Sequence, residues 1–200
     1  MAIKKEKGQL IVLSGPSGVG KSTVIAELLG QRPDIYFSVS RQPRVGEQDG
    51  VNYNFVDRAE FERMIAAQEL LEYAEYVNNY YGTSLKVIRE KLAAGIDVLL
   101  DIEVQGAAMV KDQCPDALSI FIIPPSFEEL SRRLHGRNTD SEEVISGRLE
   151  KARIEFREIP NYDYLVINDK VSNAVYEIES ILTAAQCRVE NRSGMLSQFI

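Results

Sequence analysis

Short apolar runs bounded by turn-forming residues recur along the chain, and segments with the period of an α-helix separate them. The runs lie at residues 9–14, 97–104, 119–123 and 164–168. Their length and apolar character predict buried β-strands. The helix-period segments lie at residues 22–29, 58–68, 85–94, 127–134, 141–159 and 174–191. Strands that alternate with helices are typical of a parallel sheet covered by helices on both faces, so we expect an α/β fold.

The stretch from Tyr36 to Val56 breaks this alternation. Strand-like residues at 36–40 and 50–56 flank the turn-rich segment 46–50, and no helix-period segment lies between them. Turn formers between two short strand-like segments indicate an antiparallel pair. We therefore expect a small antiparallel lobe inserted into the α/β core.

Composition narrows the classes of protein that this chain represents. A length of 200 residues, 44% of them hydrophobic, suits a single domain with a buried core. The net charge of −7 argues against binding to the phosphate backbone of a nucleic acid, which depends on Lys and Arg. Apolar runs fall short of the ~20 residues that a membrane span needs. We expect a cytoplasmic protein without nucleic-acid or membrane partners, and the sequence leaves both a monomer and a homodimer open.

Residues 14–23 read Ser-Gly-Pro-Ser-Gly-Val-Gly-Lys-Ser-Thr, between a predicted strand and a predicted helix. The spacing from Gly15 to Ser22 is that of a phosphate-binding loop, whose glycines let backbone N–H groups face phosphate oxygens at a helix N-terminus. In such a loop, Lys21 reaches the β- and γ-phosphates of ATP and the Ser22 hydroxyl faces Mg²⁺. The predicted ATP-binding residues of the loop are Gly15, Pro16, Ser17, Gly18, Val19, Gly20, Lys21, Ser22 and Thr23.

The predicted strand at 97–104 carries a carboxylate, Asp101, near its end. Beside a phosphate loop, such a carboxylate is well placed to hold a Mg²⁺-bound water or to orient the phosphoryl acceptor. We therefore expect Mg²⁺, with ATP as co-substrate, as the cofactor. Ser22 and Asp101 are its expected protein contacts, directly or through water.

Eight strings in a fixed order make the chain resemble a guanylate kinase from about Gln9 to about Asn191. The strings are SGPSGVGKST, FSVS…RQPRVGE, YNF, NYYGTS, LDIEVQGA, IFIIPPS, RRLHGRNTDSEE and VIND. The resemblance implies that ATP phosphorylates GMP, and dGMP as well, in purine nucleotide metabolism. It also implies one domain over residues 1–200 with three parts. These are a phosphate-loop core (1–35, 85–125 and 160–200), a GMP-binding lobe (36–84) and a helical lid (126–159).

The resemblance further implies a GMP site in the small lobe. Its phosphate contacts are Arg41, Arg44, Tyr53 and Tyr81. Guanidinium and phenol groups suit a dianionic phosphate monoester. Its guanine contacts are Ser40, Glu72 and Thr83, where Glu72 accepts hydrogen bonds from the N1–H and the exocyclic amine of guanine. Asp101 and Glu103 complete the implied GMP-binding set.

The lid and the adenine site are implied in the same way. Arg133, Arg137 and Arg148 are the arginines that close over the transferring phosphoryl group, and Arg133 is also counted with the ATP-binding residues. Asn168 resembles the position that meets the adenine of ATP. The implied catalytic residues are Lys21, Arg44, Asp101, Arg137 and Arg148.

Two other interpretations compete with this one. Guanylate-kinase-like scaffold domains keep the fold without catalysis and bind partner proteins, but they typically lack a working phosphate loop, whereas Gly20-Lys21-Ser22 is intact here. A phosphate-loop kinase for another monophosphate is disfavoured by Glu72 together with Tyr81-Gly82-Thr83. The inactive protein-binding module is the alternative that we keep.

The chain departs from the family pattern between Ser40 and Arg41, which are adjacent here. Family members usually carry three further residues at this point, commonly ending in two threonines. Three extended residues span up to ~10 Å, so a true deletion moves Arg41 away from the GMP phosphate or shifts the register of the loop. The other interpretation is that the natural protein carries these residues, and the close match of both flanks favours it.

An intact mass of protein purified from its natural source separates the two interpretations. We expect a mass that exceeds the 22.5 kDa of the 200-residue chain by three residue masses. A mass equal to that of the 200-residue chain would show that the loop is shorter, and Arg41 would then lose its place in the GMP phosphate site.

Overall fold

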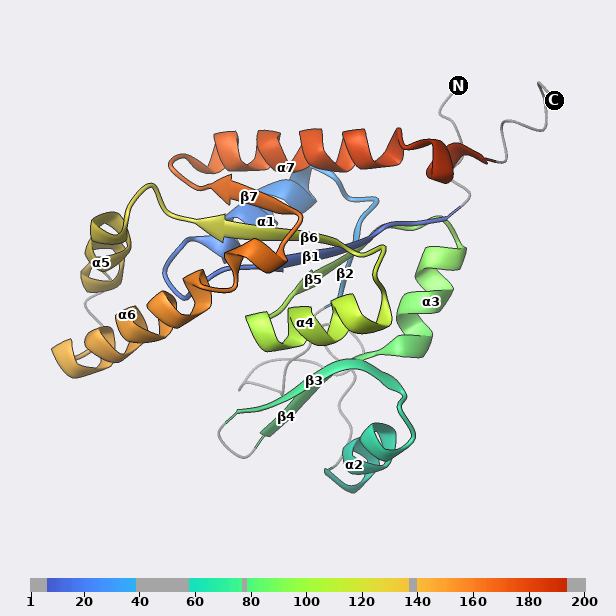
Figure 1. Ribbon diagram of the computed structural model, residues 1–200, viewed down its shortest axis with the longest axis horizontal. Helices are drawn as coiled ribbons and strands as arrows, with labels where there is room; N and C mark the ends of the chain where they lie inside the picture. Colours follow the sequence, from blue (N-terminus) through green and yellow to red (C-terminus); the bar gives the residue numbers. More distant parts are fainter. Residues whose placement is uncertain (1–6, 39–57, 77–78, 137–139, 194–200) are drawn as a thin grey trace.

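The computed structural model describes residues 7–38, 58–76, 79–136 and 140–193. Its centre is a five-stranded parallel sheet in the strand order β2-β5-β1-β6-β7 (Figure 1). The strands are β1 (Leu10–Ser14), β2 (Tyr36–Ser38), β5 (Val98–Asp101), β6 (Leu118–Ile123) and β7 (Tyr164–Ile167). The expected α/β class is confirmed, with the strands near Gln9, Asp97, Ser119 and Tyr164 in the places that the apolar runs predict.

Helices cover both faces of this sheet. The helices of the described residues are α1 (Lys21–Gln31), α2 (Arg58–Ala66), α3 (Leu85–Ala93), α4 (Val104–Gln113), α5 (Phe127–His135), α6 (Glu142–Phe156) and α7 (Val171–Gln186), with the short 3-10 helices η1 (Ile159–Asn161) and η2 (Val189–Arg192). Of these, α2 lies in the small lobe and not against the core sheet (Figure 1). Figure 1 shows α7 above the sheet and α4 below it. None of the described helices is long and apolar enough to cross a membrane.

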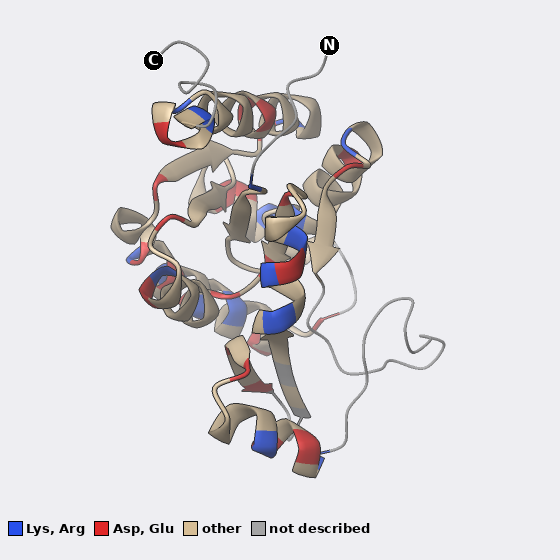
Figure 2. Ribbon diagram, turned by 90° about the vertical axis from the view of Figure 1, so that its right-hand side faces the viewer, with Lys and Arg blue, Asp and Glu red and all other residues tan. Residues whose placement is uncertain are grey.

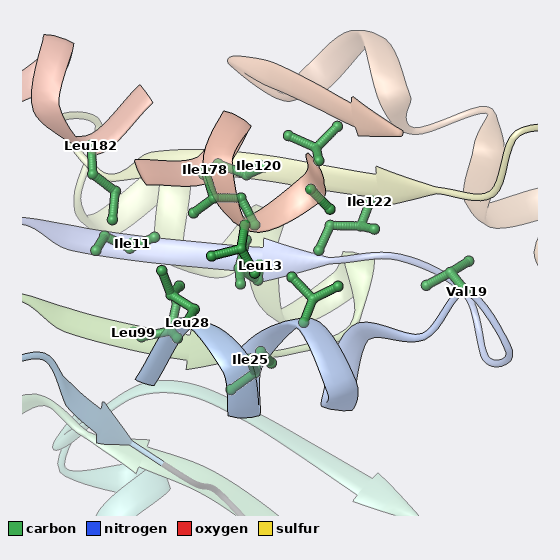
Figure 3. Close-up of a cluster of buried hydrophobic side chains, with 14 of the residues drawn as sticks. Ile11, Leu13, Val19, Ile25, Leu28, Leu99, Ile120, Ile122, Ile178 and Leu182 are labelled. Carbon is green, nitrogen blue, oxygen red and sulfur yellow. The ribbon is translucent and has the colours of Figure 1, made fainter. Parts of the chain in front are cut away.

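Alternate residues of β1 face opposite sides of the sheet, as the period of a strand requires. Ile11 and Leu13 belong to one buried cluster, whereas Leu10 and Val12 belong to a second. Figure 3 shows the first cluster, in which side chains of α1 and α7 meet those of β1 and β6. The second cluster contains residues of α3 and α4. With both faces buried, β1 has a fixed register, and the loop that follows it starts from a rigid position.

The segment Tyr36–Ser38 differs from its prediction. We expected residues 36–40 in the antiparallel insertion, but β2 pairs in parallel with β5 at the edge of the core sheet, with Tyr36 opposite Val98. The Tyr36 N–H donates to the Asp97 carbonyl at 2.8 Å, and the preceding Ile35 is buried in the first cluster. The position of β2 therefore depends on pairing with β5, which is distant in sequence. A local pattern cannot predict such pairing.

The apolar run at 97–104 also differs from its prediction. The strand ends as β5 at Asp101, and α4 begins at Val104 with Glu103 as its N-cap residue. Gly106, Ala107 and Val110 are the buried residues of α4. Ile102 and Val104 alternate with Asp101 and Glu103 across the turn, as in a strand. The pattern therefore does not mark the end of β5, and it misses α4 altogether.

The small lobe contains an antiparallel pair, β3 (Leu70–Tyr76) and β4 (Asn79–Ser84), which Figure 1 places below the core sheet beside α2. An antiparallel sheet agrees with the expected lobe, although the hydrophobic pattern assigns no strands to residues 70–84. The expected strand at 50–56 lies outside the described residues. Contacts between β3 and α4 join the lobe to the core, and one of them is a 3.0 Å hydrogen bond from Gln113 Nε2 to the Leu71 carbonyl.

The carboxylate of Asp163 joins the start of β7 to β6 and α4. It accepts hydrogen bonds from Lys111 Nζ at 2.8 Å and from the N–H and hydroxyl of Ser119 at 2.9 and 2.8 Å. Partial burial alone raises the pKa of Asp163, but the hydrogen bonds from Lys111 and Ser119 outweigh it and hold the pKa below its ordinary value. This carboxylate therefore stabilises the fold in its ionised form.

We expect Asp163→Asn to lower the free energy of unfolding by about 1 kcal/mol near neutral pH, because an amide cannot replace the charged acceptor of Lys111. The folded pKa lies below the unfolded value, so the contribution is complete above pH ~4 and is lost as the pH falls through the folded pKa. Urea unfolding of wild type and variant at about pH 7 and about pH 3 should show the difference narrowing in acid. A difference that stays constant between the two pH values would contradict the electrostatic explanation.

Candidate functional site

The loop between β1 and α1 lies at the carboxyl edge of the sheet, where β1 runs between β5 and β6. This is the edge at which open α/β sheets bind ligands. Gly18 and Gly20 have φ values of 95° and 90°, which favour glycine strongly. At Gly18 a Cβ atom would lie 2.7 Å from a methyl group of Leu134, so close packing requires glycine as well. The loop therefore has the sharp curvature that the spacing of its glycines predicts.

Lys21 is the first residue of α1 and reaches back across the loop. Its Nζ lies 2.8 Å from Asp101 Oδ1 and 3.3 Å from the Gly15 carbonyl oxygen. The side chains of Lys21 and Asp101 are only 18% and 20% exposed. The parallel register that sets Leu13 opposite Asp101 brings the carboxylate to the loop. The structure thus brings together the cation and the carboxylate that the sequence predicts at one site.

Ser22 and Thr23 occupy the first turn of α1 and are exposed. Ser22 offers a hydroxyl and Asp101 a carboxylate, which are the hard oxygen ligands that Mg²⁺ prefers. Within the described residues, no group of three or more His, Cys, Asp or Glu side chains is arranged to hold a metal ion. The donors here suit a Mg²⁺ ion that takes its remaining ligands from water and from the phosphates of a nucleotide.

Two predicted ATP-binding residues contact the backbone of the loop. Asn168 Nδ2 donates to the Val19 carbonyl at 2.7 Å, and Arg133 Nη1 donates to the same oxygen at 3.1 Å. Arg133 Nη2 also donates to the Asn168 carbonyl at 2.9 Å. Asn168 is 3% exposed, and the Val19 side chain is fully buried in the first core cluster (Figure 3). The structure therefore gathers Arg133 and Asn168 around the tip of the loop.

Glu129 orients Arg133 and is not among the predicted site residues. Its carboxylate accepts from Arg133 Nε and from Arg132, each at 2.7 Å. These hydrogen bonds lower the pKa of Glu129 to about 2. The spacing of Glu129 and Arg133 by four residues on one helix is a sequence signal that finds this pair. The side chains of Leu130 and Leu134 pack in the first core cluster with Val19, so this part of the predicted lid lies against the core here.

In the small lobe, the pairing of β3 with β4 sets Glu72 opposite Thr83. Thr83 Oγ1 donates to Glu72 Oε1 at 2.6 Å, and Glu72 and Thr83 are 3% and 2% exposed. A Cβ atom on Gly106 of α4 would lie 3.2 Å from Glu72 Oε2, so the absence of a side chain at 106 leaves room for this carboxylate. The two predicted guanine contacts thus lie together beside the core, and Gly106 is a neighbour that sequence reasoning missed.

A second charged cluster links α6 to the core near Glu103. Lys151 Nζ lies 3.2 and 3.1 Å from the two oxygens of Glu103 and 3.7 Å from Glu155 Oε1. Burial of Glu155 raises its pKa, and a nearby negative charge on Glu103 adds to this effect. Elsewhere on α6, Arg148 Nη1 forms an ion pair with Asp140 at 3.1 Å. Sequence reasoning missed Lys151 and Glu155, although their spacing of four residues is typical of a helical ion pair.

The remaining predicted site residues are not placed. Ser40, Arg41, Arg44, Tyr53 and Arg137 lie outside the described residues, as does the side chain of Tyr81. The backbone of Tyr81 belongs to β4, where it pairs with Ala74. The roles of these residues therefore stay predictions.

Figure 2 shows acidic and basic residues interspersed along the helices of the described part of the chain. On α3, for example, Lys86 and Glu90 face each other across one helical turn at 4.0 Å. This mixed distribution differs from the one-sided basic surface that is typical of nucleic-acid binding.

Comparison with known proteins agrees with this geometry. The family model described as "Guanylate kinase" matches residues 7–185. Curated guanylate kinases from Desulfitobacterium hafniense (strain Y51) and Latilactobacillus sakei subsp. sakei (strain 23K) are 49% and 51% identical, over 95% and 92% of this chain and 96% and 92% of their own. A crystal structure of guanylate kinase from Anaplasma phagocytophilum has a TM-score of 0.75 and 35% identity, over 98% of this chain and 97% of its own.

Proposed function

The chain belongs to the guanylate kinase family, and from this premise we propose that it phosphorylates GMP with ATP through the residues of the candidate site. The products are GDP and ADP, and dGMP is a second acceptor. The observation that carries the proposal is the intact phosphate loop between β1 and α1, with Lys21 at its helical end and Asp101 beside it. A loop built in this way binds the phosphates of the donor nucleotide.

The residues from Gly15 to Thr23 bind the phosphates of ATP. Their backbone N–H groups and the positive end of α1 face the anion. Lys21 is held by Asp101 in this structure, and a phosphate oxygen carrying negative charge competes for the same ammonium group. Lys21 then balances the charge that develops on the transferring phosphoryl group, which is the main contribution of a protein to this reaction.

Mg²⁺ is the metal that this oxygen donor set suits. The Ser22 hydroxyl and the Asp101 carboxylate are the protein groups that would hold it, directly or through water. When bound, the ion neutralises negative charge on the phosphates of ATP. A nucleotide that draws Lys21 away would leave Asp101 available to hold the ion and to face the acceptor phosphate.

GMP binds in the small lobe against α4. Glu72 accepts hydrogen bonds from the N1–H and the amine of guanine, while the Thr83 hydroxyl fixes one oxygen of the Glu72 carboxylate. Adenine does not present these two donors together, so Glu72 is the residue that selects the base. The other proposed GMP contacts are Ser40, Arg41, Arg44, Tyr53, Tyr81, Asp101 and Glu103.

Arginines from the lid complete the proposed catalytic site. Arg137 and Arg148 act with Arg44 to stabilise the transferring phosphoryl group, whose charge is spread over its oxygens. Arg148 is paired with Asp140 at 3.1 Å in this structure. A highly charged phosphoryl group is a stronger competitor for this guanidinium than one carboxylate.

The partners that we propose are ATP and GMP, without nucleic acid or membrane lipid. The net charge of −7 and the interspersed acidic and basic residues in Figure 2 support this. Because both nucleotides are cytoplasmic metabolites, we place the enzyme in the cytoplasm, and a monomer and a homodimer both fit the described site.

An inactive protein-binding module is less well supported, since Lys21 and the loop glycines are all in place.

Lys21→Ala tests the loop. The substitution removes the cation that faces the transferring phosphoryl group, so turnover should fall by about a hundredfold or more, while the affinity for GMP changes little. A coupled assay of GDP formation measures turnover, and calorimetry measures GMP binding. Turnover near that of the wild type would refute the role of Lys21.

Glu72→Gln tests base selection. The variant replaces one acceptor oxygen by a donor and leaves an N–H of guanine unpaired, at a cost of about 1–3 kcal/mol. We expect kcat/KM for GMP to fall about tenfold or more, with a smaller preference for GMP over AMP. Glu75→Gln is the matched control, because Glu75 lies on the same strand with a 47% exposed side chain. Unchanged discrimination by Glu72→Gln would move the guanine site elsewhere.

A further inference from the structure

The tip of the phosphate loop is held from outside by side chains that come from two distant elements. Arg133 belongs to α5, and Asn168 follows directly after β7. Both donate hydrogen bonds to one acceptor, the carbonyl oxygen of Val19, at 3.1 and 2.7 Å. Because two donors bind the Val19 carbonyl oxygen, both of its lone pairs accept hydrogen bonds. Its direction is therefore strongly fixed.

The direction of this carbonyl determines where the next N–H points. The described residues contain no cis peptide bond, so the peptide between Val19 and Gly20 is trans. In a planar trans peptide the C=O and N–H bonds point in opposite directions. Because Arg133 and Asn168 bind the Val19 carbonyl oxygen, the Gly20 N–H points away from these two side chains. Among the described residues, no backbone carbonyl accepts a hydrogen bond from this N–H.

Both donors are themselves held in place. The Asn168 N–H donates to the Ile123 carbonyl at 2.8 Å, and Arg133 Nη2 donates to the Asn168 carbonyl. Glu129 fixes the third nitrogen of the guanidinium, Arg133 Nε, at 2.7 Å. The guanidinium is thus anchored to protein groups through all three of its nitrogens, and Asn168 is buried. Side chains held in this way are suited to positioning neighbouring groups, because each of their donor nitrogens is already engaged by a protein group.

Gly20 provides independent evidence that the side chain of Asn168 lies close to the loop. Its φ of 90° lies in the left-handed region, and a Cβ atom at this position would lie only 2.6 Å from Asn168 Nδ2. The contact between Asn168 and the loop therefore requires the absence of a side chain at residue 20. The phosphate-loop glycine and the asparagine that follows β7 form one packed unit.

We propose that Arg133 and Asn168, oriented in part by Glu129, are positioning residues that aim the Gly20 N–H at the phosphates of the donor nucleotide. They act through the Val19 carbonyl and not by contacting adenine or phosphate. The inference rests on the proposed binding of ATP to this loop, and it replaces the direct nucleotide contacts that the family resemblance implies for these two residues. An N–H that is oriented before the anion arrives costs no reorganisation when it binds.

The experiment compares ATP with an anion that lacks adenine. Inorganic tripolyphosphate is used as a competitive inhibitor against ATP in the GMP phosphorylation assay, with Mg²⁺ present. The variants are Arg133→Lys, which keeps the charge but not the fork of donors, and Asn168→Ala. Arg132→Lys is the matched control. Arg132 also donates hydrogen bonds to Glu129, but its side chain is 75% exposed and contacts Glu129 rather than the loop.

We expect both variants to raise the KM for ATP and the inhibition constant of tripolyphosphate by the same factor, about three- to tenfold. The KM for GMP and all constants of Arg132→Lys should stay within about twofold of the wild type. The double variant should lose less than the product of the two single losses, because both residues act on one carbonyl. Melting temperatures are measured so that all kinetics are recorded on folded protein.

Other results would overturn the proposal. A loss of ATP affinity without loss of tripolyphosphate affinity would show direct contact with adenine. A loss for tripolyphosphate in Arg133→Lys but not in Asn168→Ala would show a direct phosphate contact by Arg133. Unchanged constants in both variants, or an equal loss in Arg132→Lys, would show that the contacts with Val19 do not orient the loop. The wild type in the same assay tests the proposed function separately, because it must phosphorylate GMP and be inhibited by tripolyphosphate.

Discussion

A loop that binds an anion with its backbone must turn its N–H groups inward, and the carbonyl oxygens of the same peptides must then find partners outside. This requirement governs the arrangement around residues 15–20. The Val19 carbonyl receives donors from Arg133 and Asn168, and the Gly15 carbonyl receives Lys21. The sheet order that puts β1 between β5 and β6 supplies the neighbours that make this possible. The position of Asp101 at the end of β5 follows from the same order.

Three cations at or near the proposed site are paired with carboxylates in the described structure. Lys21 pairs with Asp101, Arg148 with Asp140, and Lys151 with Glu103. Each pair joins a cation of the proposed site, or a neighbour of it, to a carboxylate nearby. The Lys151–Glu103 pair is exposed and contributes little to stability. Lys21 and Asp101 are mostly shielded from water, so a group that replaces this carboxylate must itself offer Lys21 a strong negative charge, as a phosphate does.

The sequence predicts the core better than it predicts the small lobe. The run at residues 9–14, the phosphate-loop spacing and the amphipathic segment 127–134 carry strong local signals, and the structure has β1, the loop and α5 at these places. β2 and β3–β4 carry weak local signals, because their positions depend on partners elsewhere in the chain. The pattern misses α4, because the alternation of Ile102 and Val104 with Asp101 and Glu103 extends the strand-like signal of β5 to the start of the helix.

The sequence predicts which residues of the site lie together better than it predicts which residues support the loop. Residue types and spacing identify Lys21 and Asp101, whereas Glu72 and Thr83 follow only from the family resemblance. The structure brings each of these two pairs together. Spacing does not reveal that Asn168 reaches the loop, since their contact spans 149 positions. This separation has a consequence for biosynthesis. The phosphate-loop sequence leaves the ribosome well before Arg133 and Asn168, which hold its tip. A nascent chain that ends before β7 carries the whole motif without the hydrogen bond from Asn168, so the loop gains its final support only after β7 has been made.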